Sequence, residues 1–163
     1  MNWYKIANKK EMIDKIKNIL KNNSFTKKLR NKYEIADEDI DNNMDIKIVD
    51  LCDDFAKGNG KEIMLDKSLF KGSFENFLKN NFHFVIHEFF HWLKRRHENS
   101  FYFNDPEEIQ SFILAIAWEM SVGRKDEDIV KKIYPIVEKH FDNKEESNKM
   151  FSEMLSKARL FGK

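Results

Sequence analysis

One long helical pattern, running from about Ser73 into the mid-90s, constrains the fold of this 163-residue chain more than any other feature. Apolar residues recur along it at helical spacing, which is typical of a helix that is buried on one side. They are Phe74, Phe77, Phe84, Val85, Phe89, Phe90 and Leu93. A buried helix needs other elements to cover it, and a chain of this length can supply them within one domain. We therefore expect a single domain over residues 1–163.

Two short segments before this helix have the composition of β-strands. β-Branched residues dominate around 45–52, and a second apolar segment, Glu62 to Asp66, follows the turn signal Gly58-Asn59-Gly60. We expect the two segments to form a small antiparallel sheet ahead of the long helix.

The rest of the chain is mainly helical in pattern. Helical spacing predicts helices over 9–22, 126–141 and 144–161, and a mixture of short helix and loop over 23–43. Asp105-Pro106-Glu107-Glu108 is typical of a helix start, and that helix should run to about Val122 and stop near Gly123. Residues Asn99 to Asn104 read as a loop. The predicted fold class is α+β, mainly helical, with a small sheet.

Composition excludes several classes of partner and site. Basic and acidic residues balance, 29 against 28, so no general charge favours nucleic acid or an acidic membrane surface. The beginning of the chain lacks the apolar run of a signal peptide, and the longest apolar run, Phe112 to Trp118, is too short to span a bilayer. Cys52 is the only cysteine, which excludes an intrachain disulfide and a zinc site made of cysteines alone. We expect a cytoplasmic protein with a buried thiol at Cys52.

The long helical pattern contains His87-Glu88-Phe89-Phe90-His91. Residues four apart lie one turn apart on the same face of a helix, so His87 and His91 can bind one Zn²⁺ together. Glu88 then lies beside the metal, where it can act as general base towards a water that the metal activates. This is the chemistry that the His-Glu-x-x-His pattern encodes in zinc peptidases. A strand shortly before such a helix is where these enzymes pair with an extended substrate.

A third protein ligand is needed, and the residues leave several candidates. His97 reproduces the spacing of a third histidine, but only if the chain leaves the helix sharply near Lys94. The preferred candidate is Glu108, at the start of the next helix, where the alternative role is helix capping. Glu107, Glu119 and Glu98 are weaker alternatives. His83, one turn before His87, is expected to be a histidine at the edge of the core.

The segment His87 to Lys94, followed by Asp105-Pro-Glu-Glu108 and then by Ser111 and Leu114-Ala115, resembles the ImmA/IrrE family of small gluzincin-like metallopeptidases. The strand-like Ile63-Met-Leu-Asp66 is also similar to that family, and the resemblance covers roughly residues 60–122. It implies a zincin-like fold, a glutamate ligand at Glu108 and a regulatory protein as substrate.

The sequence therefore predicts a zinc-dependent metalloprotease that hydrolyses a protein or peptide, of the kind that regulates phages or mobile elements. His87, His91 and Glu108 are the predicted metal ligands, and Glu88 is the predicted catalytic residue. The alternative is a non-catalytic protein with a zinc fold that binds or inhibits a host or phage regulator. Neither hypothesis predicts a nucleic acid or membrane partner, and the sequence does not predict an oligomeric state.

Overall fold

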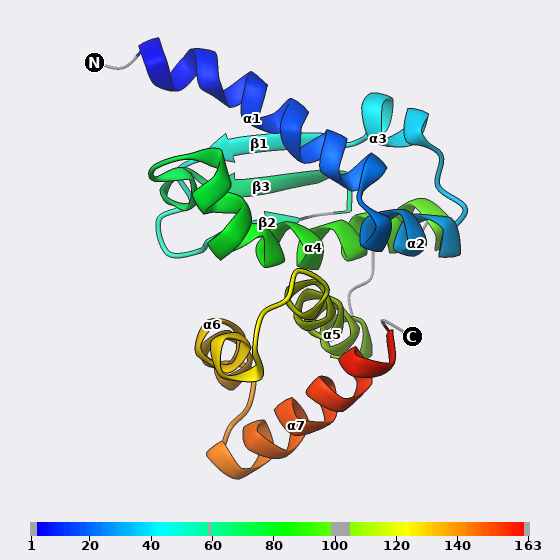
Figure 1. Ribbon diagram of the computed structural model, residues 1–163, viewed down its shortest axis with the longest axis vertical. Coiled ribbons are helices and arrows are strands. Elements are labelled where there is room, and N and C mark those ends of the chain that lie inside the picture. Colours follow the sequence, from blue (N-terminus) through cyan, green and yellow to red (C-terminus); the bar gives the residue numbers. More distant parts are fainter. Residues whose placement is uncertain (1–2, 59, 99–104, 162–163) are drawn as a thin grey trace. The chain divides into compact units, whose positions relative to one another are not determined.

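The structure is a computed structural model that describes residues 3–58, 60–98 and 105–161. The chain divides into two compact units, Met1–Phe101 and Tyr102–Lys163 (Figure 1). The predicted loop Asn99 to Asn104 lies outside the described residues. The single domain over 1–163 stays a prediction.

The first unit combines helices with one small sheet. Its elements in chain order are α1 (Trp3–Asn22), α2 (Ser24–Lys32), α3 (Asp37–Asn43), β1 (Asp45–Val49), β2 (Ala56–Gly58), β3 (Glu62–Asp66), the 3-10 helix η1 (Lys67–Phe70) and α4 (Phe74–Glu98). The second unit is helical over the residues described: α5 (Asp105–Ser121), α6 (Asp126–Glu138) and α7 (Lys144–Phe161). The predicted α+β, mainly helical class is confirmed.

The sheet is mixed, so the predicted antiparallel pairing was wrong. The two predicted strands, β1 and β3, pair in parallel, with Asp45 opposite Glu62 and Val49 opposite Asp66. An additional strand, β2, pairs with β3 in the antiparallel direction. The strand order is β1-β3-β2 (Figure 1). Residues 50–55 carry the chain across to the far edge, β2 runs back, and β3 then enters between the two in the direction of β1.

Helices contact both edges of this sheet. α1 lies beside β1, while α4 lies beside β2 and β3. The alternation of strand side chains buries Ile46 and Ile48 of β1, and Ile63 and Leu65 of β3. α4 contributes the largest block of buried aromatic and aliphatic side chains: Phe77, Phe82, Val85, Ile86, Phe89, Phe90, Trp92 and Leu93. The long helical pattern therefore forms the core of the first unit, as predicted.

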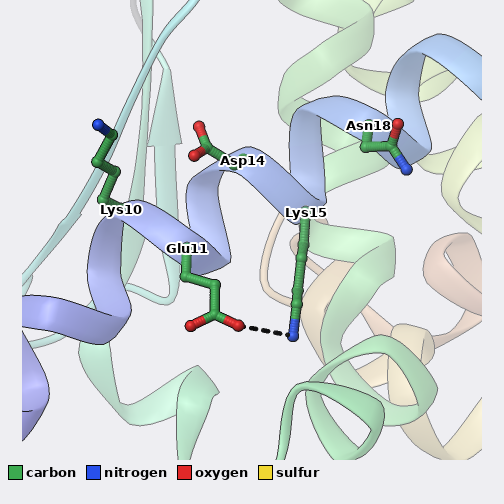
Figure 2. A pocket seen from close by; sticks show the side chains of 5 residues that line it. All are labelled: Lys10, Glu11, Asp14, Lys15 and Asn18. Atoms are coloured by element: carbon green, nitrogen blue, oxygen red, sulfur yellow. Dashed lines mark ion pairs between the residues drawn. The ribbon is translucent and has the colours of Figure 1, made fainter.

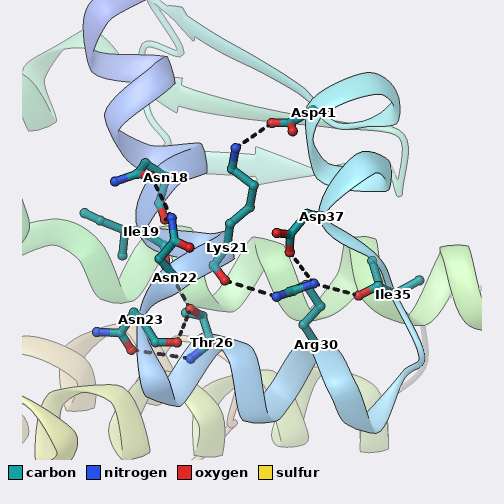
Figure 3. Close-up of polar contacts among 10 residues, drawn as sticks. All are labelled: Asn18, Ile19, Lys21, Asn22, Asn23, Thr26, Arg30, Ile35, Asp37 and Asp41. Atoms are coloured by element: carbon teal, nitrogen blue, oxygen red, sulfur yellow. Dashed lines mark hydrogen bonds and ion pairs between the residues drawn. The ribbon is translucent and has the colours of Figure 1, made fainter.

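A buried arginine links the helices at the start of the chain (Figure 3). Arg30 of α2 is only 6% exposed. Its guanidinium donates to the carbonyl oxygens of Lys21, at 3.0 Å, and Ile35, at 3.1 Å, and its Nη1 lies 2.6 Å from the Asp37 carboxylate. A buried charge is tolerated when it is paired with an opposite charge and hydrogen-bonded, as the two terminal nitrogens of Arg30 are. Arg30 therefore ties the end of α1 and the start of α3 to α2.

The loop between β1 and β2 is fixed to the end of β3 by Asp66. The Asp66 carboxylate accepts hydrogen bonds from the backbone N–H of Leu51, at 2.8 Å, and of Ser68, at 2.9 Å. Hydrogen bonds from the side chain of Ser68 and from these N–H groups lower the pKa of Asp66. Cys52 lies in this loop with φ +62° and is exposed, so the expected buried thiol was wrong. It follows the strand in a turn and does not extend it into the core.

The second unit is held together by apolar stripes on its three helices. α6 buries Ile129, Ile133 and Val137, which are spaced one turn apart, while α7 buries Phe151, Met154 and Ala158. α5 is buried on more sides, over Phe112 to Trp118. Across the described residues, no helix of either unit combines the length and apolar composition that crossing a membrane requires.

Candidate metal centre

His87 and His91 lie on one face of α4, as the spacing predicts. Their ring centroids are 5.1 Å apart at an interplanar angle of 67°, and a ligand nitrogen of each lies within 4.8 Å of the other. His91 is 2% exposed, while His87 is half-buried. α4 continues without interruption from Phe74 to Glu98, so the helix backbone fixes the spacing of the two imidazoles. Two imidazoles placed in this way fit a metal such as zinc.

Glu88, which directly follows His87 on α4, lies against β2. Its carboxylate occupies the space that a side chain at position 58 would fill, because a Cβ added to Gly58 would come within 2.5 Å of Glu88 Oε2. Real Cβ atoms do not approach an oxygen so closely, so only glycine at this position leaves room for the carboxylate. The position of Glu88 therefore depends on a strand thirty residues earlier in the chain.

Gly60, which follows β2, also lies close to a side chain of α4. A Cβ added to Gly60 would lie 2.3 Å from Cγ of Arg95, a buried residue of α4. At the other end of the strand, the ring of Phe55 lies 5.2 Å from the ring of Phe84.

These three contacts run in the same direction along both segments. Phe55, Gly58 and Gly60 lie against Phe84, Glu88 and Arg95 in turn. The described residues of the segment 55–60 therefore run beside the stretch of α4 that carries His87 and His91.

Glu108, the predicted third ligand, lies in the first turns of α5, in the second unit. Its side chain is half-buried, and its backbone carbonyl accepts a hydrogen bond of 2.6 Å from Ser111 Oγ. Among the described residues, His87, His91 and Glu108 form a group that could hold a metal ion, with one ligand atom from each. This is the set that the sequence predicts. A set of two imidazoles and one carboxylate is a donor combination that zinc accepts.

The other glutamates differ in their surroundings within the second unit. Glu119 is almost fully buried, and its Oε2 lies 3.3 Å from Lys132 Nζ and 3.5 Å from Arg124 Nε. These ion pairs give Glu119 a role in packing α5 against α6. Glu107 is buried as well, one residue before Glu108.

Position 97 lies within α4, because the helix does not end near Lys94 but continues to Glu98. A straight helix carries position 97 about 15 Å along the axis from His87. The sharp exit that a His97 ligand needs is therefore absent from α4 over the residues described. The side chains of His97 and Glu98 lie outside the described residues.

His83 is a buried residue of α4, and its ring lies 4.2 Å from the ring of Phe84. This buried placement agrees with the expectation that His83 is a histidine of the core.

A pocket on the surface of α1 offers no comparable chemistry (Figure 2). Its lining residues are exposed side chains of one helix: Lys10, Glu11, Asp14, Lys15 and Asn18. Glu11 and Lys15 form an ion pair at 3.3 Å, one turn apart. Such a pair is a common feature of a solvated helix face. The histidine pair of α4 thus remains the candidate site.

Comparison with protein-family models, curated proteins and solved structures finds no match for this chain.

The sequence pattern Gly58-Asn59-Gly60 predicted a turn, but it did not predict the close approach of Gly58 to Glu88. The available signal was that two glycines lie two residues apart just before an aliphatic strand, which can also mark a close approach of the backbone to another element.

Proposed function

We propose that this protein is a zinc-dependent metallopeptidase. The observation that carries the proposal is the arrangement on α4: two histidines lie one turn apart, and Glu88, directly after the first of them, has its carboxylate against an edge strand. His87, His91 and Glu108 are the proposed zinc ligands, which agrees with the group of described residues able to hold a metal. The resemblance of this segment to the ImmA/IrrE family adds the expectation of a regulatory protein as substrate.

Each proposed residue has a defined task in the reaction. Zinc supplies Lewis-acid activation of a water molecule and of the scissile carbonyl. Glu88 takes the proton from the attacking water, holds it on its carboxylate, and returns it to the nitrogen of the leaving amine. Gly58 leaves the carboxylate room to stay beside the histidines during both transfers. Buried His91 keeps its ring in one orientation through packing.

We further propose that the substrate lies along β2. The backbone N–H of Asp66 donates to the carbonyl of Phe55 at 2.8 Å, so the alternate residue Lys57 also faces β3. The backbone groups of Ala56 and Gly58 then face outward, at the edge of the sheet. In the part of the chain that the structure describes, no strand pairs with this edge. An extended peptide that pairs there would pass beside Glu88. The predicted strand Glu62–Asp66 lies in the middle of the sheet, so β2 takes the role of the edge strand.

The test separates metal binding from catalysis. The wild-type protein should bind one zinc per chain and cleave a protein substrate. Glu88→Gln should keep the zinc and reduce kcat/KM by about 10³-fold or more, since a general base typically contributes between 10² and 10⁴. Glu75→Gln is the matched control, because Glu75 is an exposed glutamate in the first turn of the same helix. Full activity in Glu88→Gln would exclude the mechanism.

Zinc stoichiometry identifies the ligands. His91→Ala and Glu108→Ala should each lose zinc, while His140→Ala, a change at an exposed histidine, should retain it. Loss of zinc with His97→Ala or Glu119→Ala and not with Glu108→Ala would replace the proposed third ligand. A zinc-loaded protein whose biological effect is unchanged in Glu88→Gln would instead be the non-catalytic binding protein.

A further inference from the structure

Phe55 is an aromatic side chain left on the surface next to the proposed active site. It is 51% exposed, whereas the other phenylalanines whose side chains are described are buried or half-buried. A single exposed apolar residue is common on protein surfaces. Phe55 differs because of where it lies: it directly precedes the edge strand β2, whose other end lies against Glu88.

The position of Phe55 is fixed by its backbone and by its ring. Its carbonyl accepts the hydrogen bond from Asp66 N–H, which continues the pairing of β2 with β3 by one residue. Its ring rests against the half-buried ring of Phe84, with the centroids 5.2 Å apart and the planes inclined by 34°. The two rings together form an aromatic surface that is already in place before any ligand binds, so little conformational freedom is lost on binding.

This aromatic surface lies one helical turn from the general base. Phe84 precedes Glu88 by four residues on α4, which is about 6 Å along the helix axis. An extended peptide advances about 3.3 Å per residue, so the same distance corresponds to about two residues of substrate. A peptide that pairs with the outward-facing groups of Ala56 and Gly58 would carry a side chain over the two rings.

We propose that Phe55 and Phe84 form a subsite that binds a large apolar side chain of the substrate, within about two residues of the bond that is cleaved. The inference rests on the proposed peptidase function and adds its substrate class: extended segments with an aromatic or long aliphatic residue at this position. The occupant is a substrate side chain because the surface is continuous with the edge of β2 and with Glu88. Two aromatic rings at the rim of such a surface favour another flat apolar group.

The experiment measures peptide binding without cleavage. The ¹⁵N-labelled full chain carrying Glu88→Gln is titrated with a blocked pentapeptide, acetyl-Ala-Ala-Phe-Ala-Ala-amide, and with the same peptide carrying alanine or lysine at its centre. The phenylalanine peptide should shift the backbone N–H signals of Phe55 to Gly58 and bind at least several times more tightly than the other two. Phe55→Ala should weaken its binding by about 3- to 10-fold, which is the usual contribution of one aromatic contact.

Two further variants make the result specific. Phe84→Ala should cause a similar loss, and Leu160→Ala, which removes another exposed apolar side chain, should cause none. Equal binding of the three peptides, or unchanged binding in both phenylalanine variants, would overturn the subsite. The cleavage assay is independent of this titration: a protein that binds the phenylalanine peptide through Phe55 but cleaves nothing would retain the subsite and lose the peptidase function.

Discussion

The two edge strands of the sheet both pair with β3, yet they are built from different residues for different surroundings. β1 has five residues with alternating burial, and its Ile46 and Ile48 enter the core next to α1. β2 has three residues, Ala56 to Gly58, and contributes no large side chain to the core. Its distinctive contact is the approach of Gly58 to the Glu88 carboxylate on α4.

We infer that the two edge strands have different roles: β1 stabilises the fold, and β2 serves the proposed site. β1 contributes buried apolar area, which stabilises the folded unit. β2 contributes an edge with which no described strand pairs, and a glycine at the point where the Glu88 carboxylate lies. A substitution of a buried residue in β1 should therefore lower the stability of the fold and leave turnover nearly unchanged. A substitution of Gly58 in β2 should lower turnover and leave stability nearly unchanged.

Among substitutions in the sheet, the largest expected effect is that of Gly58→Ala on turnover. The new methyl group would displace the Glu88 carboxylate, which is the flexible end of its side chain, so the fold can adapt while the proposed general base moves. A displacement of about 1 Å can reduce a rate by about 10²-fold. We expect kcat/KM to fall by that factor, with zinc stoichiometry unchanged and the free energy of unfolding changed by less than about 1 kcal/mol.

Lys57→Ala is the control for Gly58→Ala, because Lys57 is an exposed neighbour on the same strand. It should leave both turnover and stability close to those of the wild type. A Gly58→Ala protein with full activity would show that β2 does not position Glu88, and the distinction between the two edges would fail.

The next effect is that of Ile48→Ala in β1 on stability. Removing a buried isoleucine side chain costs about 2–5 kcal/mol, and an edge strand can relax, so we expect a loss of about 2 kcal/mol in the free energy of unfolding. Urea denaturation measures this loss. The kcat/KM of the folded protein should stay within about twofold of the wild type, since Ile48 makes no contribution to the proposed site. A large loss of turnover in Ile48→Ala would contradict the distinction between the two edge strands.

A smaller effect is expected at Asp66, which fixes the chain between the two edge strands. Asp66→Ala removes the acceptor for Leu51 and Ser68 and should cost about 1 kcal/mol at pH 7. Because folding lowers the pKa of Asp66, the ionised carboxylate stabilises the fold at pH values above its unfolded pKa of about 3.9. This stabilisation is lost as the pH falls through the lower pKa of Asp66 in the folded protein. The difference in stability between variant and wild type should therefore be constant from pH 5 to 7 and shrink below about pH 4.

The smallest effect is expected at Lys47, on the exposed face of β1. Lys47 Nζ lies 2.8 Å from Glu62 Oε2, and this contact, with the nearby Asp45, raises the pKa of Lys47. Exposed ion pairs contribute little, so Lys47→Met should change the melting temperature only slightly at pH 7. Because folding raises the pKa of Lys47, the charged lysine stabilises the fold at pH values below its unfolded pKa. This stabilisation is lost as the pH rises through the pKa of Lys47 in the folded protein. Thermal melts of the two proteins should therefore converge above about pH 11.

The helices could be predicted from the sequence because their signals are local. α4 and α5 have the predicted starts within one residue, and His87 and His91 share a face because four residues make about one turn. β1 and β3 were also found, since Ile46, Ile48, Ile63 and Leu65 follow the strand pattern.

The topology of the sheet could not be predicted in the same way. β2 reads Ala-Lys-Gly, without a β-branched residue, and its conformation depends on pairing with β3 and on contact with α4. Because β2 was missed, β1 and β3 appeared to be neighbours joined by one turn, which implies antiparallel pairing. The contact between Gly58 and Glu88 joins residues thirty positions apart, so no local pattern predicts it.

The contacts of Phe55 and Gly58 with successive turns of α4 have a consequence for how this sequence tolerates insertions and deletions. One residue added between Phe55 and Gly58 would shift every later position by about 3.3 Å and put a side chain where glycine is required. One residue added at Asp53 or Asp54, in the exposed loop before it, can be absorbed without moving the strand. A library of single-residue insertions across 50–60 should therefore show a sharp boundary at Phe55, with active variants before it and inactive variants after it.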